Sequence, residues 1–260
     1  MEMEQLNSGC RIFVYDTCGS TMDLMLDLWQ EGAAGPFDSV LAEIQTEGRG
    51  RMRKEWIASC GNLNVSFALP DDIMEKNGWP ENLIPLLIGC GISEALAGEG
   101  IETGIKWPND IVFREKKLGG ILVEKKRDVY IVGVGLNIKE RPDFQGKDHG
   151  FSLLPVSLAD AGVSLTDPLA LWRNMAEILF DFFEKTLAKE TPMVFNRKFI
   201  RKCIWINETV ELSTSSGDVA TALLKGVSPS GALILKQNNE EFEVFSGSIR
   251  KPGNGSGNFF

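Results

Sequence analysis

Short apolar and β-branched runs alternate with longer amphipathic stretches along the first 140 residues. Runs at 11–16, 39–45 and 64–70 predict β-strands, and Ser20 followed by Asp23 predicts a capped helix that ends near Gly32. Residues 83–98 predict a largely apolar helix, buried on more than one face. Four more β-type runs follow at 104–107, 111–113, 120–126 and 130–138. Strands interleaved with helices indicate an α/β or α+β body.

The pattern changes twice in the second half of the chain. From Asp167 to Leu187 apolar residues recur every three or four positions, which predicts one long amphipathic helix with its aromatic side chains in the core. After Trp205, β-type runs at 210–213, 220–227, 232–237 and 241–245 predict a small β-barrel or sandwich. We therefore expect a large domain over 1–204, a small one over 205–250, and a flexible tail over 251–260.

Composition narrows the possible functions. The chain has 27 Lys and Arg against 36 Asp and Glu, a net charge of −9, which argues against nucleic acid as a partner. It has neither a membrane-length apolar run nor an export signal, so we expect a cytoplasmic protein. Five widely spaced cysteines predict buried thiols rather than disulfides or zinc. With His149 as the single histidine, catalysis by positioning and charge is favoured over a histidine-dependent nucleophile.

Two segments combine the residue types that bind anions. Residues 47–56, EGRGRMRKEW, place four basic side chains beside two glycines, and guanidinium groups bind phosphates and carboxylates in a bidentate way. Residues 104–110, GIKWPND, present a lysine, an amide and a carboxylate close together. A solvated basic loop and a simple turn explain these two segments equally well. Glycines in 117–124 and 133–137 indicate either close approach of a ligand or backbone, or a bulge.

The order of these motifs resembles one family, the biotin protein ligases. The family carries Ser-Thr-Asn, Gln, GRGRxxRxW, KWPND, KxxGILxE and GxGxN in that order. Here they stand as Ser20-Thr21, Gln45, GRGRMRKEW at 48–56, KWPND at 106–110, KLGGILVE at 117–124 and GVGLN at 133–137. The resemblance extends over about residues 11–250.

The resemblance implies an α+β fold, a mixed sheet packed against helices like that of class II synthetases, with a small C-terminal SH3-like β-barrel. It also implies an activity: biotin is activated with ATP and Mg²⁺ to biotinyl-5′-AMP, and the biotinyl group then passes to a lysine of a biotin carboxyl carrier domain. Such a protein is a monomer or a homodimer, with no nucleic-acid or membrane partner. Because few residues precede Arg11, we expect a monofunctional ligase without a DNA-binding domain.

The family's functional residues carry over motif by motif. Lys106, between the biotin carboxylate and the α-phosphate, and Arg51, near the phosphate, are the expected catalytic residues. Biotin binding is expected from Ser20, Thr21, Gln45, Gly48, Arg49, Gly50, Arg51, Lys106, Gly120 and Ile121, with Lys117 lining the same pocket. Nucleotide binding is expected from Arg51, Lys54, Trp56, Lys106, Asn109, Asn137 and Arg250, and metal binding from Asp110.

Two positions depart from the family pattern and leave alternatives open. Met22 replaces the usual Asn, and Lys54 replaces an Arg, keeping its charge without its fork of donors. The departures admit a biotin-binding sensor without turnover, and the related lipoate or octanoate ligases are a second alternative. An unrelated α/β binding module would require the ordered motifs to be coincidence.

Overall fold

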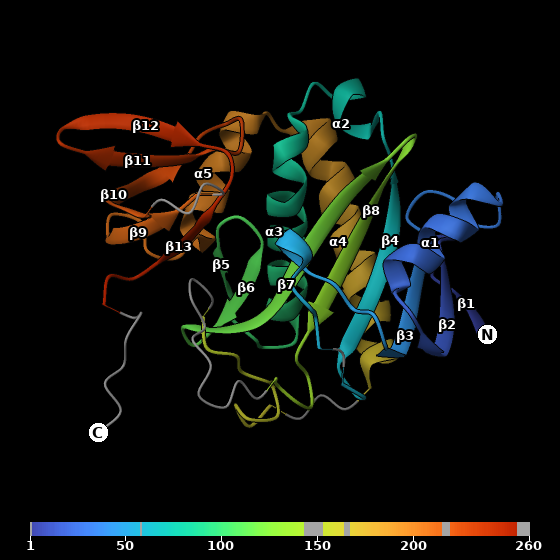
Figure 1. Cartoon of the computed structure of the whole chain (residues 1–260). Coiled ribbons are helices and arrows are strands. Elements are labelled where there is room, and N and C mark those ends of the chain that lie inside the picture. Colours follow the sequence, from blue (N-terminus) through green and yellow to red (C-terminus); the bar gives the residue numbers. More distant parts are fainter. Residues whose placement is uncertain (1, 58, 143–152, 164–166, 215–218, 254–260) are drawn as a thin grey trace.

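The computed structural model describes residues 2–57, 59–142, 153–163, 167–214 and 219–253. His149 and most of the expected C-terminal tail lie outside these residues. The body is built on an eight-stranded sheet (Figure 1), in which β2 and β3 run parallel and every other neighbouring pair runs antiparallel. Its strands, in spatial order, are β1 (Glu2–Gln5), β2 (Arg11–Cys18), β3 (Ser39–Gln45), β4 (Leu63–Pro70), β8 (Val129–Leu136), β7 (Lys116–Lys126), β6 (Asp110–Phe113) and β5 (Gly104–Lys106).

Helices cover both faces of this sheet. Helix α1 (Thr21–Gln30) packs its buried Met22 and Met25 in a small cluster with Ala68 and Ile131. Helices α3 (Ile84–Gly98) and α4 (Pro168–Lys189) lie on the other face, with the larger core. The predicted mixed sheet packed against helices is therefore confirmed.

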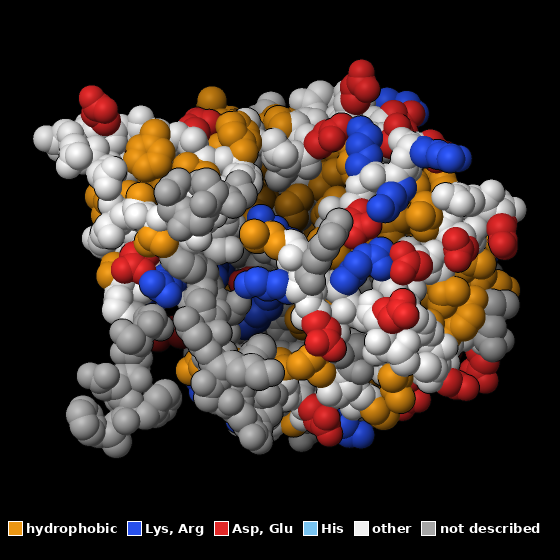
Figure 2. Space-filling model, in the orientation of Figure 1, with side chains coloured by type: hydrophobic (Ala, Val, Ile, Leu, Met, Phe, Trp, Pro, Cys, Tyr) orange, Lys and Arg blue, Asp and Glu red, His pale blue; other side chains and the backbone are white. Residues whose placement is uncertain are grey.

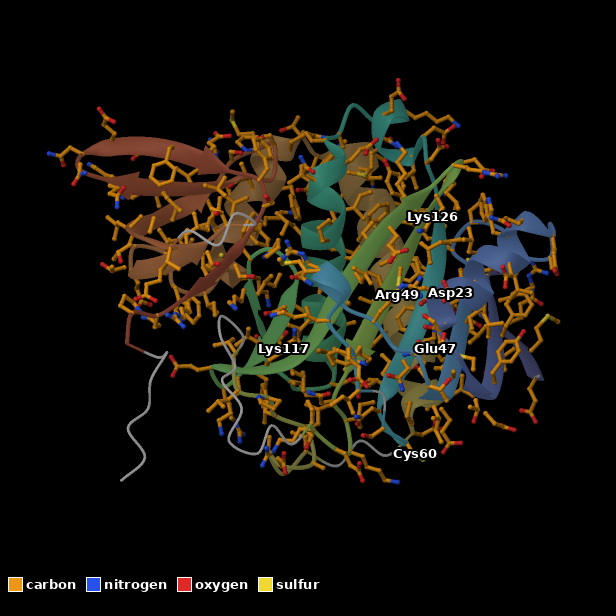
Figure 3. All side chains as sticks on the ribbon, viewed as in Figure 1. Asp23, Glu47, Arg49, Cys60, Lys117 and Lys126 are labelled. Carbon is orange, nitrogen blue, oxygen red and sulfur yellow. The ribbon has the colours of Figure 1, made fainter. Side chains whose placement is uncertain are left out.

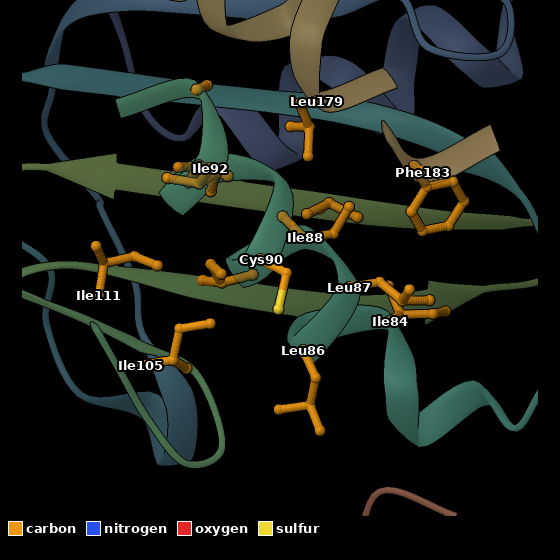
Figure 4. Close-up of a cluster of buried hydrophobic side chains, with 14 of the residues drawn as sticks. Ile84, Leu86, Leu87, Ile88, Cys90, Ile92, Ile105, Ile111, Leu179 and Phe183 are labelled. Carbon is orange, nitrogen blue, oxygen red and sulfur yellow. The ribbon is translucent and has the colours of Figure 1, made fainter. Parts of the chain in front are cut away.

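Helix α3 is the centre of the larger core. Figure 4 shows side chains of this helix, such as Ile88 and Ile92, between strand residues and the α4 residues Leu179 and Phe183. The two helices approach closely at Gly91, where a Cβ atom would stand 2.5 Å from Cδ1 of Leu179. Burial on several sides explains why the 83–98 segment is apolar nearly all round. The aromatic side chains at the predicted positions of α4 are core residues, as expected.

The C-terminal strands form a second sheet of five antiparallel strands. Its order is β12 (Glu240–Val244), β11 (Leu233–Gln237), β10 (Val219–Val227), β9 (Thr209–Ser213) and β13 (Ser248–Arg250). Closure into the predicted SH3-like barrel is not found among the described strands. The short β13 pairs with β9 alone, so β12 and β13 remain at opposite edges of an open sheet.

Hydrogen bonds hold the KWPND segment against the stretch of chain that leads into the second sheet and against the turn between β10 and β11 of that sheet. The backbone NH of Ile204 donates to the Ile105 carbonyl at 2.9 Å, and Nε1 of Trp107 donates to the Gly231 carbonyl at 3.1 Å. Helix α5 (Pro192–Lys202) leads into this junction. The C-terminal strands therefore stand beside the segment that carries Lys106.

The sequence analysis missed several elements, and one detail was wrong. Strand β1, the short helices α2 (Ile73–Lys76), η1 (Arg51–Arg53) and η2 (Glu81–Leu83), α5 and β13 were not predicted. Helix α1 begins as expected after Ser20, but the Ser20 side chain makes no capping bond. Its hydroxyl accepts from Arg49 instead, and Asp23 also binds Arg49. The five cysteines are free thiols, as predicted, but only Cys90 and Cys203 are buried, whereas Cys10 and Cys18 are partly buried and Cys60 is exposed.

Candidate active site

A cavity of about 520 Å³ opens where the GRGR loop, the KWPND segment and the central strands meet. Figure 2 shows Lys and Arg side chains gathered around a hollow near the middle of this face. The cavity brings together most of the residues expected from sequence: Ser20, Thr21, Gln45, Arg49, Gly50, Arg51, Lys54, Trp56, Lys106, Asn109, Asp110, Lys117, Gly120, Ile121 and Asn137. Gly48 and Arg250 are expected site residues that do not line it.

A compact group of charges lies at one end of the cavity. Asp110, at the start of β6, forms two ion pairs. Its Oδ1 lies 2.6 Å from Nζ of Lys117, and its Oδ2 lies 3.6 Å from Nζ of Lys106. The positive charge of the Arg51 guanidinium also acts to lower the pKa of this carboxylate. Lys106 is only 3% exposed, and its ammonium lies 5.9 Å from the centroid of the Trp205 ring. Three cations around one carboxylate leave a local excess of positive charge in an acidic protein.

Burial and charge act in opposite directions on this group. Burial lowers the pKa of Lys106 below its usual value, and the neighbouring Asp110 carboxylate opposes that shift. Burial acts to raise the pKa of Asp110, but the Lys117 and Lys106 ammonium groups hold it below its ordinary value. Desolvation lowers the pKa of Arg51. Asp110 is thus ionised and neutralises only part of the surrounding charge, so an anionic ligand is attracted here.

The other end of the cavity carries uncharged hydrogen-bonding groups. The backbone NH and the hydroxyl of Thr21 donate to Oε1 of Gln45 at 2.8 and 3.0 Å. The Thr21 hydroxyl also lies 2.8 Å from the hydroxyl of Ser66 on β4. With its oxygen engaged in this way, Gln45 presents its amide nitrogen as a donor. Ser66 was missed from sequence, and its signal was a single hydroxyl in the otherwise apolar run VSFAL.

The wall beside these groups is apolar where the family pattern has an amide. Met22 is buried, and its sulfur would lie 3.0 Å from a Cβ atom at Gly133. Val65, Ile121, Leu122 and Val134 line the same cavity. Methionine here fills space against the glycine of β8, which supports the interpretation of this glycine as a point of close approach.

The GRGR loop is a small hairpin. Arg49 and Glu55 form an antiparallel bridge, the Trp56 NH donates to the Gly48 carbonyl at 2.9 Å, and a Cβ atom at Gly48 would stand 2.4 Å from the Trp56 carbonyl oxygen. Gly48 therefore shapes the hairpin rather than lining the cavity. The Trp56 indole donates to Oδ1 of buried Asn64 at 3.2 Å. The loop thus ends in a tryptophan fixed on the sheet.

Arg51 hydrogen-bonds the tip of the hairpin both to the body and to the C-terminal part that carries the second sheet. Its Nη1 donates to Oδ1 of Asn109 at 3.3 Å and to the Gly247 carbonyl at 3.4 Å. Asn109 is itself held on β7, because its Nδ2 donates to the Ile121 carbonyl at 2.7 Å. Arg51 is therefore placed between the KWPND segment and the second sheet.

Arg49 makes a different set of contacts. Its guanidinium donates to Asp23 on α1, to Glu124 on β7 and to the hydroxyl of Ser20. Figure 3 shows Arg49 and Asp23 lying together, with Lys126 nearby. In this conformation the side chain binds protein groups, so its expected contact with biotin stays a prediction.

Of two other residues predicted to bind the nucleotide, Asn137 lines the cavity and Arg250 does not. Asn137 lines the cavity, and its buried Oδ1 has no hydrogen-bond partner among the described residues, which makes it an acceptor ready for a ligand donor. Arg250 instead donates to Glu211 at 2.6 Å, away from the cavity lining. Ser248, two residues earlier on β13, lines the cavity and was missed.

The metal expected at Asp110 has few protein ligands to meet it. The described part of the chain holds no group of three or more His, Cys, Asp or Glu side chains suited to a metal ion. Mg²⁺ keeps waters and substrate phosphates as ligands and needs only one or two carboxylates from the protein. Asp110 lies in a phosphate-attracting site, and both of its oxygens face lysine ammonium groups, so a magnesium ion would enter with the nucleotide phosphates and take the place of one of these contacts.

Comparison with known proteins bears on what this cavity does. A sequence profile of the biotin/lipoate A/B protein ligase family matches residues 15–138. A biotin–[acetyl-CoA-carboxylase] ligase of Mycobacterium tuberculosis is 34% identical over 158 residues, 58% of this chain and 57% of that ligase. The bifunctional ligase/repressor BirA of Bacillus subtilis is 34% identical over 258 residues, 93% of this chain and 74% of that protein.

Solved structures of biotin protein ligases resemble the fold of this chain. The biotin protein ligase of Aquifex aeolicus, in complex with biotin and ATP, superposes with a TM-score of 0.77 at 26% identity, over 92% of this chain and 97% of that one. The Leishmania major ligase shares the fold at a TM-score of 0.59 and 21% identity, over 90% of this chain and 98% of that one. With the profile match and the similarity to the Bacillus protein, these findings show that the chain belongs to the biotin/lipoate A/B protein ligase family.

Proposed function

We propose that the protein is a biotin protein ligase, which activates biotin with ATP and transfers it to a lysine of a biotin carboxyl carrier domain. The observation that carries the proposal is one cavity with an uncharged donor and acceptor set at Thr21, Gln45 and Ser66 and a positive group around Lys106. The first set suits a ureido head group, and the second suits a carboxylate beside a phosphate.

The first step joins two anions. An oxygen of the biotin carboxylate attacks the α-phosphorus of ATP, the bond to the β-phosphate breaks, and pyrophosphate leaves. Lys106, buried beside Asp110, supplies a fixed ammonium group that stabilises the charge developing on the transferring phosphoryl group. Arg51, held by Asn109 and the Gly247 carbonyl, adds a second cation at the same end.

The second step transfers the acyl group. A carrier lysine, as its neutral amine, attacks the carbonyl carbon of the mixed anhydride, and the C–O bond to AMP breaks. AMP leaves, and the nitrogen loses a proton to solvent as the amide forms. Neither step needs a covalent enzyme intermediate, consistent with catalysis by position and charge. The proposed nucleotide contacts line the cavity and are Lys54, Trp56, Asn109, Asn137 and Ser248. Lys117, expected in the biotin pocket, forms an ion pair with Asp110, which supports a position nearer the phosphates. Gly120 and Ile121 form the biotin wall.

Mg²⁺ would reach the site on the nucleotide phosphates, with Asp110 as its protein ligand. When bound, the ion would neutralise phosphate charge and favour departure of pyrophosphate. The names of relatives as acetyl-CoA-carboxylase ligases support a carboxylase carrier as the protein substrate. Use of ATP supports a cytoplasmic site of action, and none of the helices in the described residues is long and apolar enough to cross a membrane.

The domain division at residues 204 and 250 belongs to this proposal. The separate hydrogen-bonded sheets support it, and the second sheet contributes Gly247 and Ser248 beside the phosphate end. The eight-stranded sheet ends at β1 on one side and at β5 on the other, where Ile105 forms a bridge with Cys203. An edge strand such as β1 is compatible with either a monomer or a homodimer.

The proposal is tested by pyrophosphate release from Mg-ATP on addition of biotin, with lipoate and octanoate in parallel and mass detection of the acyl adenylate. We expect release and a biotinyl-adenylate mass with biotin alone. Pyrophosphate release with lipoate or octanoate, and not with biotin, would show that the protein is a lipoate or octanoate ligase instead. Biotin binding without pyrophosphate release would identify a sensor. The transfer step is tested by adding a biotin carboxyl carrier domain to the active mixture, where we expect it to gain one biotinyl group.

A further inference from the structure

Arg49 lies between two carboxylates on different elements, at the base of the hairpin that covers the cavity. We propose that Asp23 and Glu124 are positioning residues that hold the 48–56 hairpin closed through Arg49, and that this clasp retains the acyl adenylate until the carrier lysine arrives. The inference rests on the proposed function for its purpose, but the clasp itself is visible in the contacts.

The guanidinium is held on both sides. Its Nη1 and Nη2 donate to the two oxygens of Asp23 at 2.7 and 2.8 Å, a bidentate arrangement. Nε and Nη2 donate to the two oxygens of Glu124 at 3.1 and 3.4 Å. Glu124 is fixed in turn by Lys126 at 3.0 Å. Asp23 belongs to α1 and Glu124 to β7, so a single side chain of the hairpin joins two elements that are far apart in sequence.

These contacts use the whole donor capacity of Arg49. A guanidinium has five N–H donors, and the fifth hydrogen bond goes from Nη1 to the Ser20 hydroxyl at 3.1 Å. In this closed arrangement no donor of Arg49 remains for biotin. The hydrogen bond to Asp23 raises the pKa of Arg49, and a guanidinium group keeps its proton in proteins in any case. Arg49 therefore acts as a fastener of the hairpin.

The clasp is placed where closure matters. Ser20 and Arg49 line the cavity beside Thr21 and Gln45, the proposed biotin end. The other attachments of the hairpin, Arg51 to Asn109 and Trp56 to Asn64, lie on the nucleotide side. Losing the clasp would free the hairpin over the biotin end and leave those attachments in place. The intermediate is a mixed anhydride, reactive toward water and any amine, so its escape wastes ATP.

The direct test is the rate at which preformed, labelled biotinyl-adenylate leaves the full-length enzyme in the presence of excess unlabelled biotin. We expect Asp23→Asn and Glu124→Gln each to increase the release rate about threefold to tenfold, as partly exposed charge-assisted bonds are lost. Arg49→Met should increase it further, and adding either carboxylate change to Arg49→Met should have no additional effect. Asp181→Asn, which removes an exposed ion pair to Lys185 on α4, is the matched control and should release at the wild-type rate.

A second measurement needs no substrate and separates failure of the clasp from failure of the proposed function. Arg51 and Lys54 are trypsin sites within the hairpin, so the clasp should slow their cleavage in the ligand-free protein. We expect faster cleavage there in Asp23→Asn and Glu124→Gln than in wild type or Asp181→Asn. If wild type makes no adenylate but these cleavage rates differ, the function is wrong and the clasp stands.

The inference is overturned by release and cleavage rates that are unchanged in both carboxylate variants. It is equally overturned if Arg49→Met raises KM for biotin while Asp23→Asn and Glu124→Gln leave KM and release at wild-type values. That pattern would mean that Arg49 acts by touching biotin directly.

Discussion

The indole of Trp56 occupies the space that Gly135 leaves open: a Cβ atom at Gly135 would stand 2.3 Å from Cζ2 of the ring. Asn64 lies opposite Gly135 in the pairing of β4 with β8, and its Oδ1 accepts from the indole Nε1. Gly135 of GVGLN and Trp56 of GRGRMRKEW therefore contact each other, although they are 79 residues apart in the sequence.

Substitution of Gly135 by alanine should displace this indole. Because overpacking of this kind costs about 1–3 kcal/mol, we expect KM for ATP to rise about tenfold in pyrophosphate release, with a smaller change in KM for biotin. Gly98→Ala, at a position where a Cβ atom meets nothing within 4 Å, is the control. An unchanged KM for ATP in Gly135→Ala would remove Trp56 from the nucleotide site.

Removal of the Lys106 ammonium should slow adenylation by about two to three orders of magnitude without unfolding the protein. In Lys106→Ala, Asp110 keeps its ion pair to Lys117, so the carboxylate is not left uncompensated. Loss of one fixed charge at a transferring phosphoryl group costs about 10²–10³-fold in rate. Pyrophosphate release measures the rate, and thermal unfolding checks the fold. Turnover close to wild type would contradict the mechanism.

The pH profile of adenylation should have a basic limb set by Lys106. Burial lowers the pKa of this lysine and Asp110 partly restores it. Activity needs the ammonium form, so it should fall as pH rises through this lowered pKa. In Asp110→Asn the restoring charge is lost, and the limb should move to lower pH. A limb that stays in place in Asp110→Asn, measured by pyrophosphate release, would assign it to another group.

Asp110 should also make folding stability depend on pH at the acid end. Its pKa is lowered from 3.8 in the folded protein, because the lysine cations outweigh the effect of burial. A lowered carboxylate pKa stabilises the native state above about pH 4, and this contribution is lost as pH falls through the folded-state value. Urea unfolding between pH 3 and 7 should therefore show a weaker acid dependence in Asp110→Asn than in wild type.

Met22→Asn, which restores the residue usual in the family, should destabilise the protein. Met22 is buried against Gly133 and packs with Met25, Ala68 and Ile131. An amide placed in this cluster loses apolar packing and costs about 1–3 kcal/mol, whereas Met22→Leu should cost under about 1.5 kcal/mol. Urea unfolding compares the two. Equal stability of Met22→Asn and wild type would mean that the amide finds partners in the cavity.

Elements with a strong local pattern were predictable. The period of the 167–187 segment and the continuous apolarity of 83–98 both gave helices within two residues of their observed ends. Strand β1 was not predictable, because its sequence EMEQ is polar and it forms only by pairing with β2. Helix α5 did carry a signal, Thr191 followed by Pro192, and Thr191 does cap it.

The sequence by itself determined which chemical groups this protein brings to its site, because the ordered motifs carry the cations, amides and glycines that the reaction needs. The tertiary structure decided which of those groups face the cavity and which bind one another. It turned Arg49 toward Asp23 and Glu124, paired Arg250 with Glu211, and brought Ser66 to Thr21. The physical reason is that a motif fixes local spacing, whereas the partners of a charged side chain depend on which distant strands and helices pack beside it.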